Sequence, residues 1–236
     1  MQKTFLFLAL IPVITFSQVS SPVKDLLQSV SDKAEDYLLE GKINQAIKEY
    51  EQYLKTHPNC HETKTYLAAL YGTIGDSKKE FEFCNSAIKS KPDFAGVYIN
   101  LGNAFTRKGQ PVEAEQNYLK AYHLAKSSNT FITAGAAYSL CNFYMDNPNF
   151  QKAIEWANIC LDNCAQIIPN DKHTKIHHNN LIKNATLNKA GAYANQKNFK
   201  TAIMIVKEFL EKNPNDTDAH QMLSELNHFQ QLKPSK

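Results

Sequence analysis

The chain has 236 residues, with 26 Lys+Arg against 23 Asp+Glu and a formal net charge of +3. Without residues 1–17, which contain Lys3 as their one charged side chain, the chain has 25 basic and 23 acidic residues. A balance this close to neutral gives no reason to expect nucleic acid or an anionic membrane as the target. The remaining length suits a single solenoid of helix pairs.

Residues 1–17 have the pattern of a secretory signal peptide. Lys3 supplies a positive start, residues 5–16 are largely apolar, and small residues precede a cleavage site expected near Ser17. The apolar run is shorter than the roughly 20 residues that span a membrane, and Pro12 interrupts it. We therefore predict a bacterial protein exported to the periplasm or secreted, without an integral membrane span, and a short leader over 18–26.

The stretch 95–128 contains the clearest pattern in the chain. Two segments with one apolar face each are separated by Gly109, which ends the first helix, and by Pro111, which fits the first position of the second. The small residues Gly102 and Ala114 are predicted at the crossing of the two helices, where they let the backbones approach closely. The apolar residues around them are Tyr98, Leu101, Phe105, Val112, Tyr118, Ala121 and Tyr122.

This pattern recurs with a period of 34 residues. Gly75 lies 34 residues after Gly41, Gly109 lies 34 after Gly75, and Pro92 lies 34 after Pro58. A helix–turn–helix unit of this period resembles the tetratricopeptide repeat (TPR) family. The resemblance implies an all-α fold, a right-handed α-α superhelical solenoid of about five TPR-like helix pairs followed by a C-terminal capping helix.

The repeats differ in regularity along the chain. Three regular repeats are predicted over 27–128, and two longer or degenerate repeats over 129–216, with helices over 130–146 and 150–168. An insertion at 170–182 matches no repeat position and is expected to extend the next helix backward. A capping helix over 217–232 and a tail over 233–236 complete the chain, and no run alternates with the period of a strand.

Glu80 departs from the pattern of the second repeat. It occupies the position that Ala114 holds in the third repeat, where a small residue is expected. Because burying an unpaired carboxylate is costly, we expect the Glu80 carboxylate to reach either solvent or a partner, and we favour a local adjustment of register as the explanation.

In the TPR family, the first helices of successive repeats line a concave groove that binds peptides or partner helices. The resemblance therefore implies a protein or peptide partner. Asparagine amides can pair with an extended backbone, and an arginine can pair with a carboxylate. The positions that match the groove and are predicted to contact a partner are Tyr66, Asn100, Asn103, Arg107, Tyr138, Asn142, Asn188 and Asn195.

Cysteine and histidine residues suggest an alternative function, that of a metal- or thiol-dependent envelope protein. Cys160 and Cys164 are four residues apart on a predicted helix, as are His173 and His177, and such a set could bind zinc. The preferred interpretation has no metal and no cofactor: a polar histidine-rich linker, with Cys84, Cys141 and Cys160 as small buried core residues. A further alternative is a homo-oligomeric structural solenoid.

Signatures of catalysis are absent from the sequence. There is no Walker loop, and no GxGxxG, GxSxG or HExxH motif. We therefore predict that the protein is not an enzyme, and that it acts as an interaction scaffold or adaptor of the cell envelope.

Overall fold

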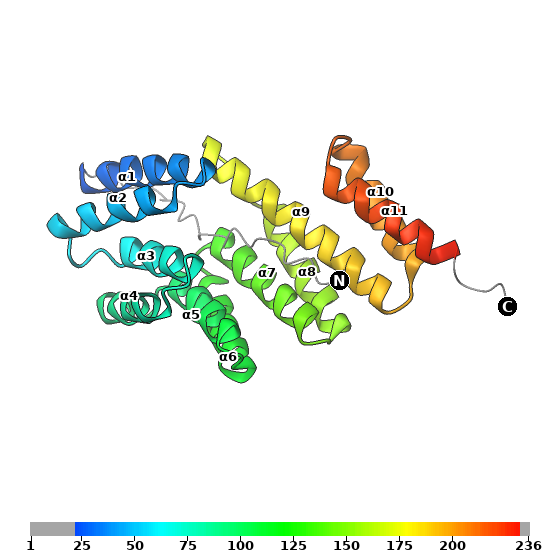
Figure 1. Ribbon diagram of the computed structural model, residues 1–236, viewed down its shortest axis with the longest axis horizontal. Coiled ribbons are helices and arrows are strands. Elements are labelled where there is room, and N and C mark those ends of the chain that lie inside the picture. The colour runs from blue at the N-terminus through cyan, green and yellow to red at the C-terminus, as the bar shows by residue number, and fades with distance from the viewer. Residues whose placement is uncertain (1–21, 232–236) are drawn as a thin grey trace. The chain divides into compact units, whose positions relative to one another are not determined.

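A computed structural model of the chain describes residues 22–231, which form eleven helices and contain no strand (Figure 1). The predicted signal peptide over 1–17, the first part of the leader and the tail lie outside these residues. The helices are α1 (Pro22–Leu39), α2 (Ile43–Thr56), α3 (His61–Thr73), α4 (Ser77–Ser90), α5 (Ala95–Arg107), α6 (Pro111–Ala125), α7 (Thr130–Asp146), α8 (Phe150–Cys164), α9 (Lys172–Asn195), α10 (Phe199–Lys212) and α11 (Thr217–Gln231).

The chain divides into two compact units. The first unit extends to Ile132 and also includes Pro169–His177, whereas the second comprises Thr133–Ile168 and the chain from His178 onward. Helix α9 therefore begins in the first unit and continues in the second.

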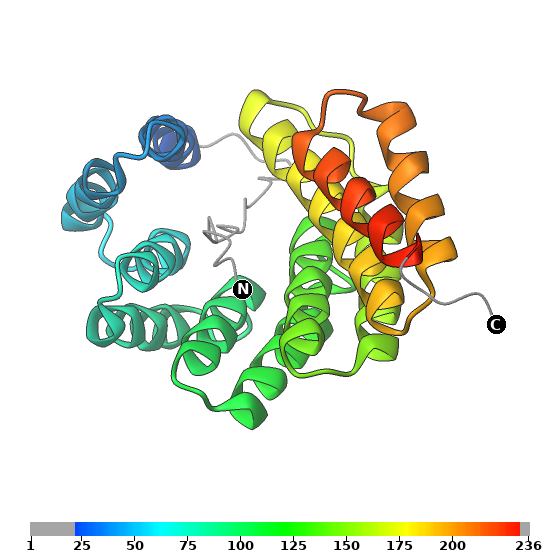
Figure 2. The same cartoon turned by 45° about the vertical axis from the view of Figure 1, so that its right-hand side comes forward.

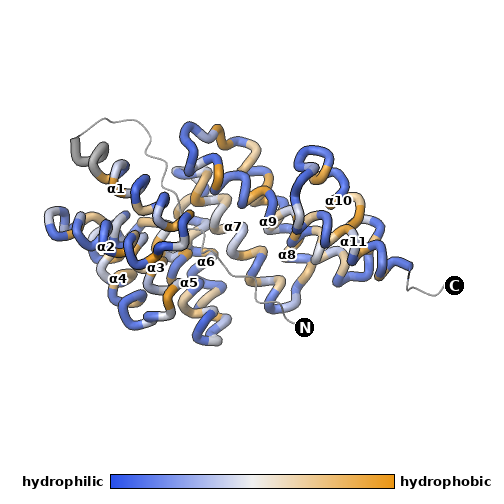
Figure 3. Tube along the Cα trace, turned by 45° about the horizontal axis from the view of Figure 1, so that its top comes forward, coloured by the Kyte–Doolittle hydropathy of each residue, from blue (hydrophilic) through white to orange (hydrophobic). Residues whose placement is uncertain are grey.

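In the first unit, consecutive helices pack as pairs. Helix α1 packs on α2, α3 on α4 and α5 on α6, and each pair also contacts the next through α2 with α3 and α4 with α5. Hydrophobic and hydrophilic residues are mixed along the helices (Figure 3). Helices α2, α4 and α6 bury residues at helical spacing on one side, whereas long runs of α3 and α5 are buried all round. The core between α1, α2 and α3 contains Ala34, Ala46, Ile47, Tyr50, Tyr66, Leu67, Ala69, Leu70 and Tyr71.

The turns within the helix pairs have a common geometry. Gly41, Gly75 and Gly109 adopt φ values of 74°, 81° and 68°, a left-handed conformation that costs glycine little. The 34-residue glycine spacing thus marks three equivalent helix ends. In two later pairs the second helix begins at an asparagine cap, where Asn149 accepts from Lys152 N and Asn198 accepts from Thr201 N.

The α5–α6 crossing has the small residues that the sequence predicts. Ala114 is fully buried, and a Cβ added to Gly102 would overlap the ring of Tyr118. The hydroxyl of Tyr118 donates to Asn103 Oδ1 at 2.7 Å. The absence of a side chain at Gly102 is therefore what lets the Tyr118 ring lie against α5.

A tyrosine–lysine contact recurs in both units. Lys79 Nζ lies 4.4 Å from the ring centroid of Tyr71 and donates to its hydroxyl at 3.0 Å. Lys152 Nζ lies 4.7 Å from the ring centroid of Tyr144 and likewise donates to its hydroxyl at 3.0 Å. Both pairs join the end of one helix to the start of the next, so they stabilise equivalent helix hairpins.

The second unit ends in the capping helix predicted from the sequence. Helices α10 and α11, drawn in orange and red, lie side by side (Figure 2). Lys183 Nζ of α9 pairs with Asp216 Oδ2 at 2.8 Å and with Asp218 Oδ2 at 2.7 Å, which fixes the start of α11. The buried core of this end contains Ala190, Ala202, Ile203, Ile205, Val206, Phe209, Leu210, Ala219 and Leu226.

Two helix limits differ from the sequence-based expectation. Helix α1 already begins at Pro22, within the predicted leader, because proline suits the first turn of a helix. Helix α8 ends at Cys164 rather than near residue 168. His178 Nε2 lies 2.9 Å from the Cys164 carbonyl oxygen, and Ile168 is 92% exposed. Ile168 therefore buries almost no apolar surface that would stabilise a further turn.

Candidate functional site

The predicted groove residues Tyr66 and Asn100 lie at contacts between neighbouring helices of the first unit. The ring of Tyr66 stacks on that of Tyr50 with centroids 5.0 Å apart. Asn100 Nδ2 donates to the Thr65 carbonyl oxygen at 2.8 Å, which joins α5 to α3. Both side chains therefore already stabilise the helix stack, and partner contact through them stays a prediction.

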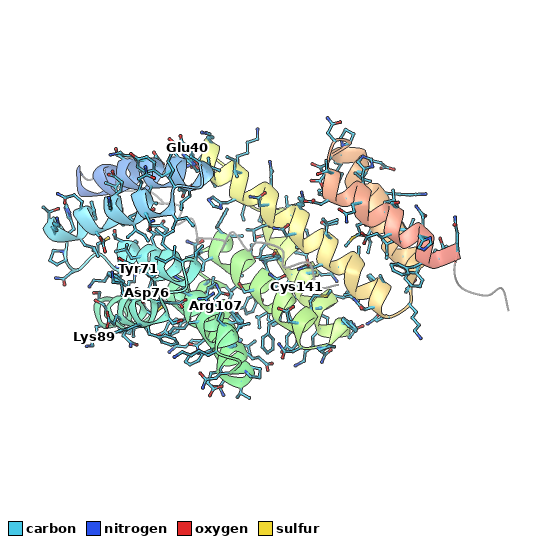
Figure 4. All side chains as sticks on the ribbon, in the orientation of Figure 1. Glu40, Tyr71, Asp76, Lys89, Arg107 and Cys141 are labelled. Atoms are coloured by element: carbon cyan, nitrogen blue, oxygen red, sulfur yellow. The ribbon has the colours of Figure 1, made fainter. Side chains whose placement is uncertain are left out.

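Asn103 and Arg107 lie one turn apart on α5 and serve different neighbours. Asn103 accepts from Tyr118 on α6, whereas Arg107 donates to Glu80 Oε1 on α4. The Arg107 side chain remains 43% exposed, and Figure 4 shows it at the end of α5. Arg107 thus combines an internal ion pair with a surface that a partner could contact.

Of the two outcomes expected for Glu80, the structure has the partner rather than solvent. The Glu80 side chain is 1% exposed, and its charge is compensated by Arg107 from the next helix pair. Burial raises the pKa of the Glu80 carboxyl, and the neighbouring Arg107 opposes that rise. Oε2 of Glu80 has no hydrogen bond from the described residues. The helices keep their register because the ion pair, rather than solvent, accommodates the carboxylate.

Gly72 makes room for this ion pair. A Cβ at Gly72 would overlap Glu80 Oε1 and lie 2.6 Å from a guanidinium nitrogen of Arg107. The sequence did indicate that this position is unusual, because it has Glu80 where an alanine is expected. The identity of its partner was not readable from the sequence, since Arg107 lies 27 residues further along the chain.

The second unit brings three predicted site residues together. Asn188 Nδ2 of α9 donates to Asn142 Oδ1 of α7, and both side chains are partly exposed. Asn142 also forms a hydrogen bond with Tyr138, and Asn188 forms one with the Cys141 thiol. Burial raises the pKa of Tyr138 and of Cys141 to about 12 each, so both groups are neutral at physiological pH. We call Tyr138, Asn142 and Asn188 the amide cluster.

Asn195 lies outside the amide cluster. It is exposed near the end of α9, and its Nδ2 donates to the Gly191 carbonyl oxygen of its own helix at 2.9 Å. A side-chain bond to the preceding turn is a local interaction that requires no partner. Asn195 is therefore a useful matched control for the amide cluster.

The four residues of the alternative zinc site divide between the two units, with Cys160 and Cys164 in the second and His173 and His177 in the first. Cys160 and Cys164 are buried on α8 and hydrogen-bonded to one another, whereas His173 and His177 both contact Glu35. Within residues 22–231, no group of three or more His, Cys, Asp and Glu side chains is placed to hold a metal ion.

The cysteines behave as core residues. Cys84, Cys141 and Cys160 are buried as predicted, Cys164 is buried as well, and Cys60 is intermediate. Burial raises the pKa of the Cys84 thiol, while the hydrogen bond between Cys160 and Cys164 raises the pKa of the first and lowers that of the second. Cys164 is only 1% exposed, so its thiol is inaccessible to a substrate despite the lowered pKa.

No protein-family model and no curated protein matches the sequence. Solved structures do match the fold. A chain of the APC/C hetero-tetramer Cut9–Hcn1 has a TM-score of 0.66 and 22% identity over 82% of this chain, which spans 35% of that one. The thermophilic TPR protein TTC0263 of Thermus thermophilus has a TM-score of 0.64 and 17% identity, covering 84% of this chain and 97% of its own. BtubC from P. vanneervenii has a TM-score of 0.61 and 17% identity, covering 91% and 85%.

Among the described helices, none is long and apolar enough to cross a membrane. The all-helical architecture, the 34-residue spacing of its turns and the similarity to solved TPR structures agree with one another. The chain has a superhelical fold of the tetratricopeptide repeat type.

Proposed function

We propose that this protein is a non-enzymatic interaction scaffold of the bacterial cell envelope, which binds a peptide or partner protein along the inner helices of its repeats. The fold supports a binding role, because stacked helix pairs build an extended surface from many side chains. The envelope location rests on the sequence pattern of residues 1–17 alone. N-terminal sequencing of the protein purified from the envelope fraction tests it, with Gln18 expected near the start.

The amide cluster is the observation that carries the binding proposal. Asn142 and Asn188 come from the first helices of the last two repeats, are partly exposed and are joined to one another. A carboxamide has two donor hydrogens and two acceptor lone pairs, so each side chain retains groups that can bond a peptide backbone. Their mutual bond fixes their orientation in advance, which reduces the entropy lost on binding.

The test uses peptides selected on the mature protein from a random display library. Affinity is then measured by fluorescence anisotropy for the wild type and for the Asn142→Ala/Asn188→Ala variant. We expect the double change to weaken binding about tenfold, equivalent to about 1.4 kcal/mol. Helical circular dichroism should be unchanged, because both side chains are partly exposed.

Asn195→Ala is the matched control, since it removes an exposed amide from the same helix. Equal affinity of the amide-cluster variant and the wild type would place the binding surface elsewhere. Failure to select any peptide, together with a sedimentation coefficient above that of the monomer, would favour the homo-oligomeric alternative instead.

A further inference from the structure

Titratable side chains join α1 to the start of α9 within the first unit. Oε2 of Glu35 lies 3.2 Å from Nδ1 of His173 and 3.2 Å from Nε2 of His177. Since the two histidines are four residues apart on one helix, they share a face of α9. A single carboxylate oxygen thus receives two imidazole rings from a distant part of the sequence. We call this arrangement the Glu35 contact.

The Glu35 contact is largely shielded from water. The side chains of Glu35, His173 and His177 are 9%, 12% and 19% exposed, respectively. Charges in such a site interact more strongly than charges on an open surface, where salt and water screen them. The protonation state of the two rings therefore matters more here than it would for exposed histidines.

Further charged groups approach the histidines from α1 and from the first turn of α9. Asp36 Oδ1 lies 3.7 Å from His173 Nε2 and 3.3 Å from Lys172 Nζ. Asp171 accepts a backbone hydrogen bond from His173 and experiences its charge. Asp36 and Lys172 are both more than half exposed, so their mutual attraction is weak.

Glu35 also interacts with Tyr50 of α2, which supplies no positive charge. Tyr50 of α2 is fully buried, and charges on Glu35 and Asp32 contribute to the rise in its pKa, which burial dominates. Neither residue supplies a positive charge to Glu35. Apart from the histidines, Lys172 is therefore the single cation among these groups, and carboxylates outnumber it.

This charge balance determines the effect of pH. When both rings are neutral, the carboxylates at the contact are in excess and repel one another. Protonation of His173 and His177 places two positive charges against Glu35 and turns both contacts into ion pairs. Histidine is the side chain type whose ordinary pKa lies between about pH 5 and 8. Falling pH should therefore strengthen the contact, and rising pH should weaken it.

We infer that the Glu35 contact is a protonation-sensitive switch, which holds residues 169–177 on α1 while the histidines are charged and releases them when the histidines are neutral. The inference concerns the first unit alone and does not depend on the proposed peptide binding by the amide cluster. It assigns a regulatory role to the histidine-rich segment that matches no repeat position.

Amide hydrogen exchange of the full mature chain tests this inference. Exchange is followed by mass spectrometry at about pH 5.5 and about pH 8, on either side of the histidine range, with EDTA present to remove metal ions. Rates are corrected for the intrinsic effect of pH with an unstructured reference peptide. We expect peptides covering 172–177 to open about tenfold more often at the higher pH, a change equivalent to about 1.4 kcal/mol.

Two variants separate a charge effect from a packing effect. Glu35→Gln preserves shape and hydrogen bonding but cannot attract an imidazolium, so the pH response should disappear. His177→Gln alone should reduce the response without abolishing it, and keeps the test valid if Glu35→Gln fails to fold. His220→Gln/His228→Gln on α11 is the control and should respond like the wild type. Equal protection of wild-type 172–177 at both pH values, or an unchanged response in Glu35→Gln, would overturn the inference.

Discussion

The second and third helix pairs solve the same packing problem in different ways. In α5–α6, Gly102 lies against the ring of Tyr118, and Ala114 is the small residue at the crossing. Each of these has a counterpart 34 residues earlier in α3–α4: Ala68 for Gly102, Cys84 for Tyr118 and Glu80 for Ala114. The large side chain of the second pair therefore comes from a different position of the second helix.

The glycine moves together with the large side chain. Gly72, the counterpart of Thr106, lies one turn beyond Ala68 and faces the Glu80 carboxylate. Cys84 is smaller than its counterpart Tyr118, and the buried side chain of Glu80, which is 1% exposed, fills the difference in volume. Within a repeat, the position of the side-chain-free residue thus indicates where the bulky group of the partner helix will pack. The two helix pairs keep the same backbone arrangement because either combination of side chains fills the space between the helices.

Gly102→Ala should have the largest effect on stability. The added Cβ overlaps an aromatic ring that is enclosed between two helices and cannot move aside. Overpacking of this kind costs about 3 kcal/mol, and the better helix propensity of alanine returns about 1 kcal/mol. We therefore expect the free energy of unfolding to fall by about 2 kcal/mol, measured by urea denaturation followed by circular dichroism.

Gly72→Ala is the matched control for this change. Its Cβ would overlap only the ends of the flexible Glu80 and Arg107 side chains, which can shift. We expect a stability within about 1 kcal/mol of the wild type. We call the α5–α6 contact of Gly102 with Tyr118 the aromatic crossing, and the α3–α4 contact of Gly72 with Glu80 the charged crossing. Equal losses of stability in the two variants would show that the two crossings are equally rigid.

Arg107→Met should have the next largest effect. It leaves the Glu80 carboxylate buried without its cation, and an unpaired buried charge costs several kcal/mol. Since Arg107 is 43% exposed and water can partly replace it, we expect a loss of about 1.5 kcal/mol in urea denaturation. For the same reason, Arg107 substitutions are poor probes of partner binding, because they should also lower stability.

A second change tests whether this loss comes from the bare carboxylate. Glu80→Ala restores the small residue that the other repeats place at this position. In the Glu80→Ala/Arg107→Met variant, most of the lost stability should return, giving a coupling energy of about 1 kcal/mol. Additive losses in the double variant would mean that the two side chains stabilise the helices independently.

The sequence was sufficient to predict those parts of the fold that depend on periodicity alone. Helix α7 has the predicted limits, Thr130–Asp146, and the insertion does extend α9 backward to Lys172. The turn glycines were also predictable, because a left-handed helix end favours glycine wherever it occurs. These features depend on local backbone chemistry or on one face of one helix, and a single sequence contains that information.

Contacts between residues far apart in sequence were not predictable in the same way. The pairing of Glu80 with Arg107, and of Glu35 with His173 and His177, depends on which helices become neighbours. Of the predicted site residues, Tyr138, Asn142 and Asn188 are brought together, whereas Asn195 bonds its own helix. Position within a repeat indicates the side of a helix, but the hydrogen-bond partner depends on the neighbouring repeat.

The pH dependence of stability gives the smallest and most specific test of the charged crossing. The pKa of the Glu80 carboxyl is raised, chiefly by burial, so the folded state binds this proton more tightly than the unfolded state. The protonated Glu80 carboxyl therefore contributes its full stabilisation below the ordinary carboxyl pKa, near pH 4. This contribution is lost as the pH rises through the raised pKa that the carboxyl has in the folded state.

Glu80→Gln replaces the carboxyl by an isosteric group that cannot ionise, so the variant should not lose stability in this pH range. The stability of the wild type relative to Glu80→Gln, measured by urea denaturation at a series of pH values, should therefore decrease from about pH 4 toward neutrality. Because Arg107 opposes the effect of burial, we expect the decrease to be smaller than the loss caused by Arg107→Met. A relative stability that increases with pH would mean that the attraction of Arg107 exceeds the cost of burial. Glu80 would then be a net stabilising ion-pair partner, and the charged crossing would hold the helices as firmly as the aromatic one.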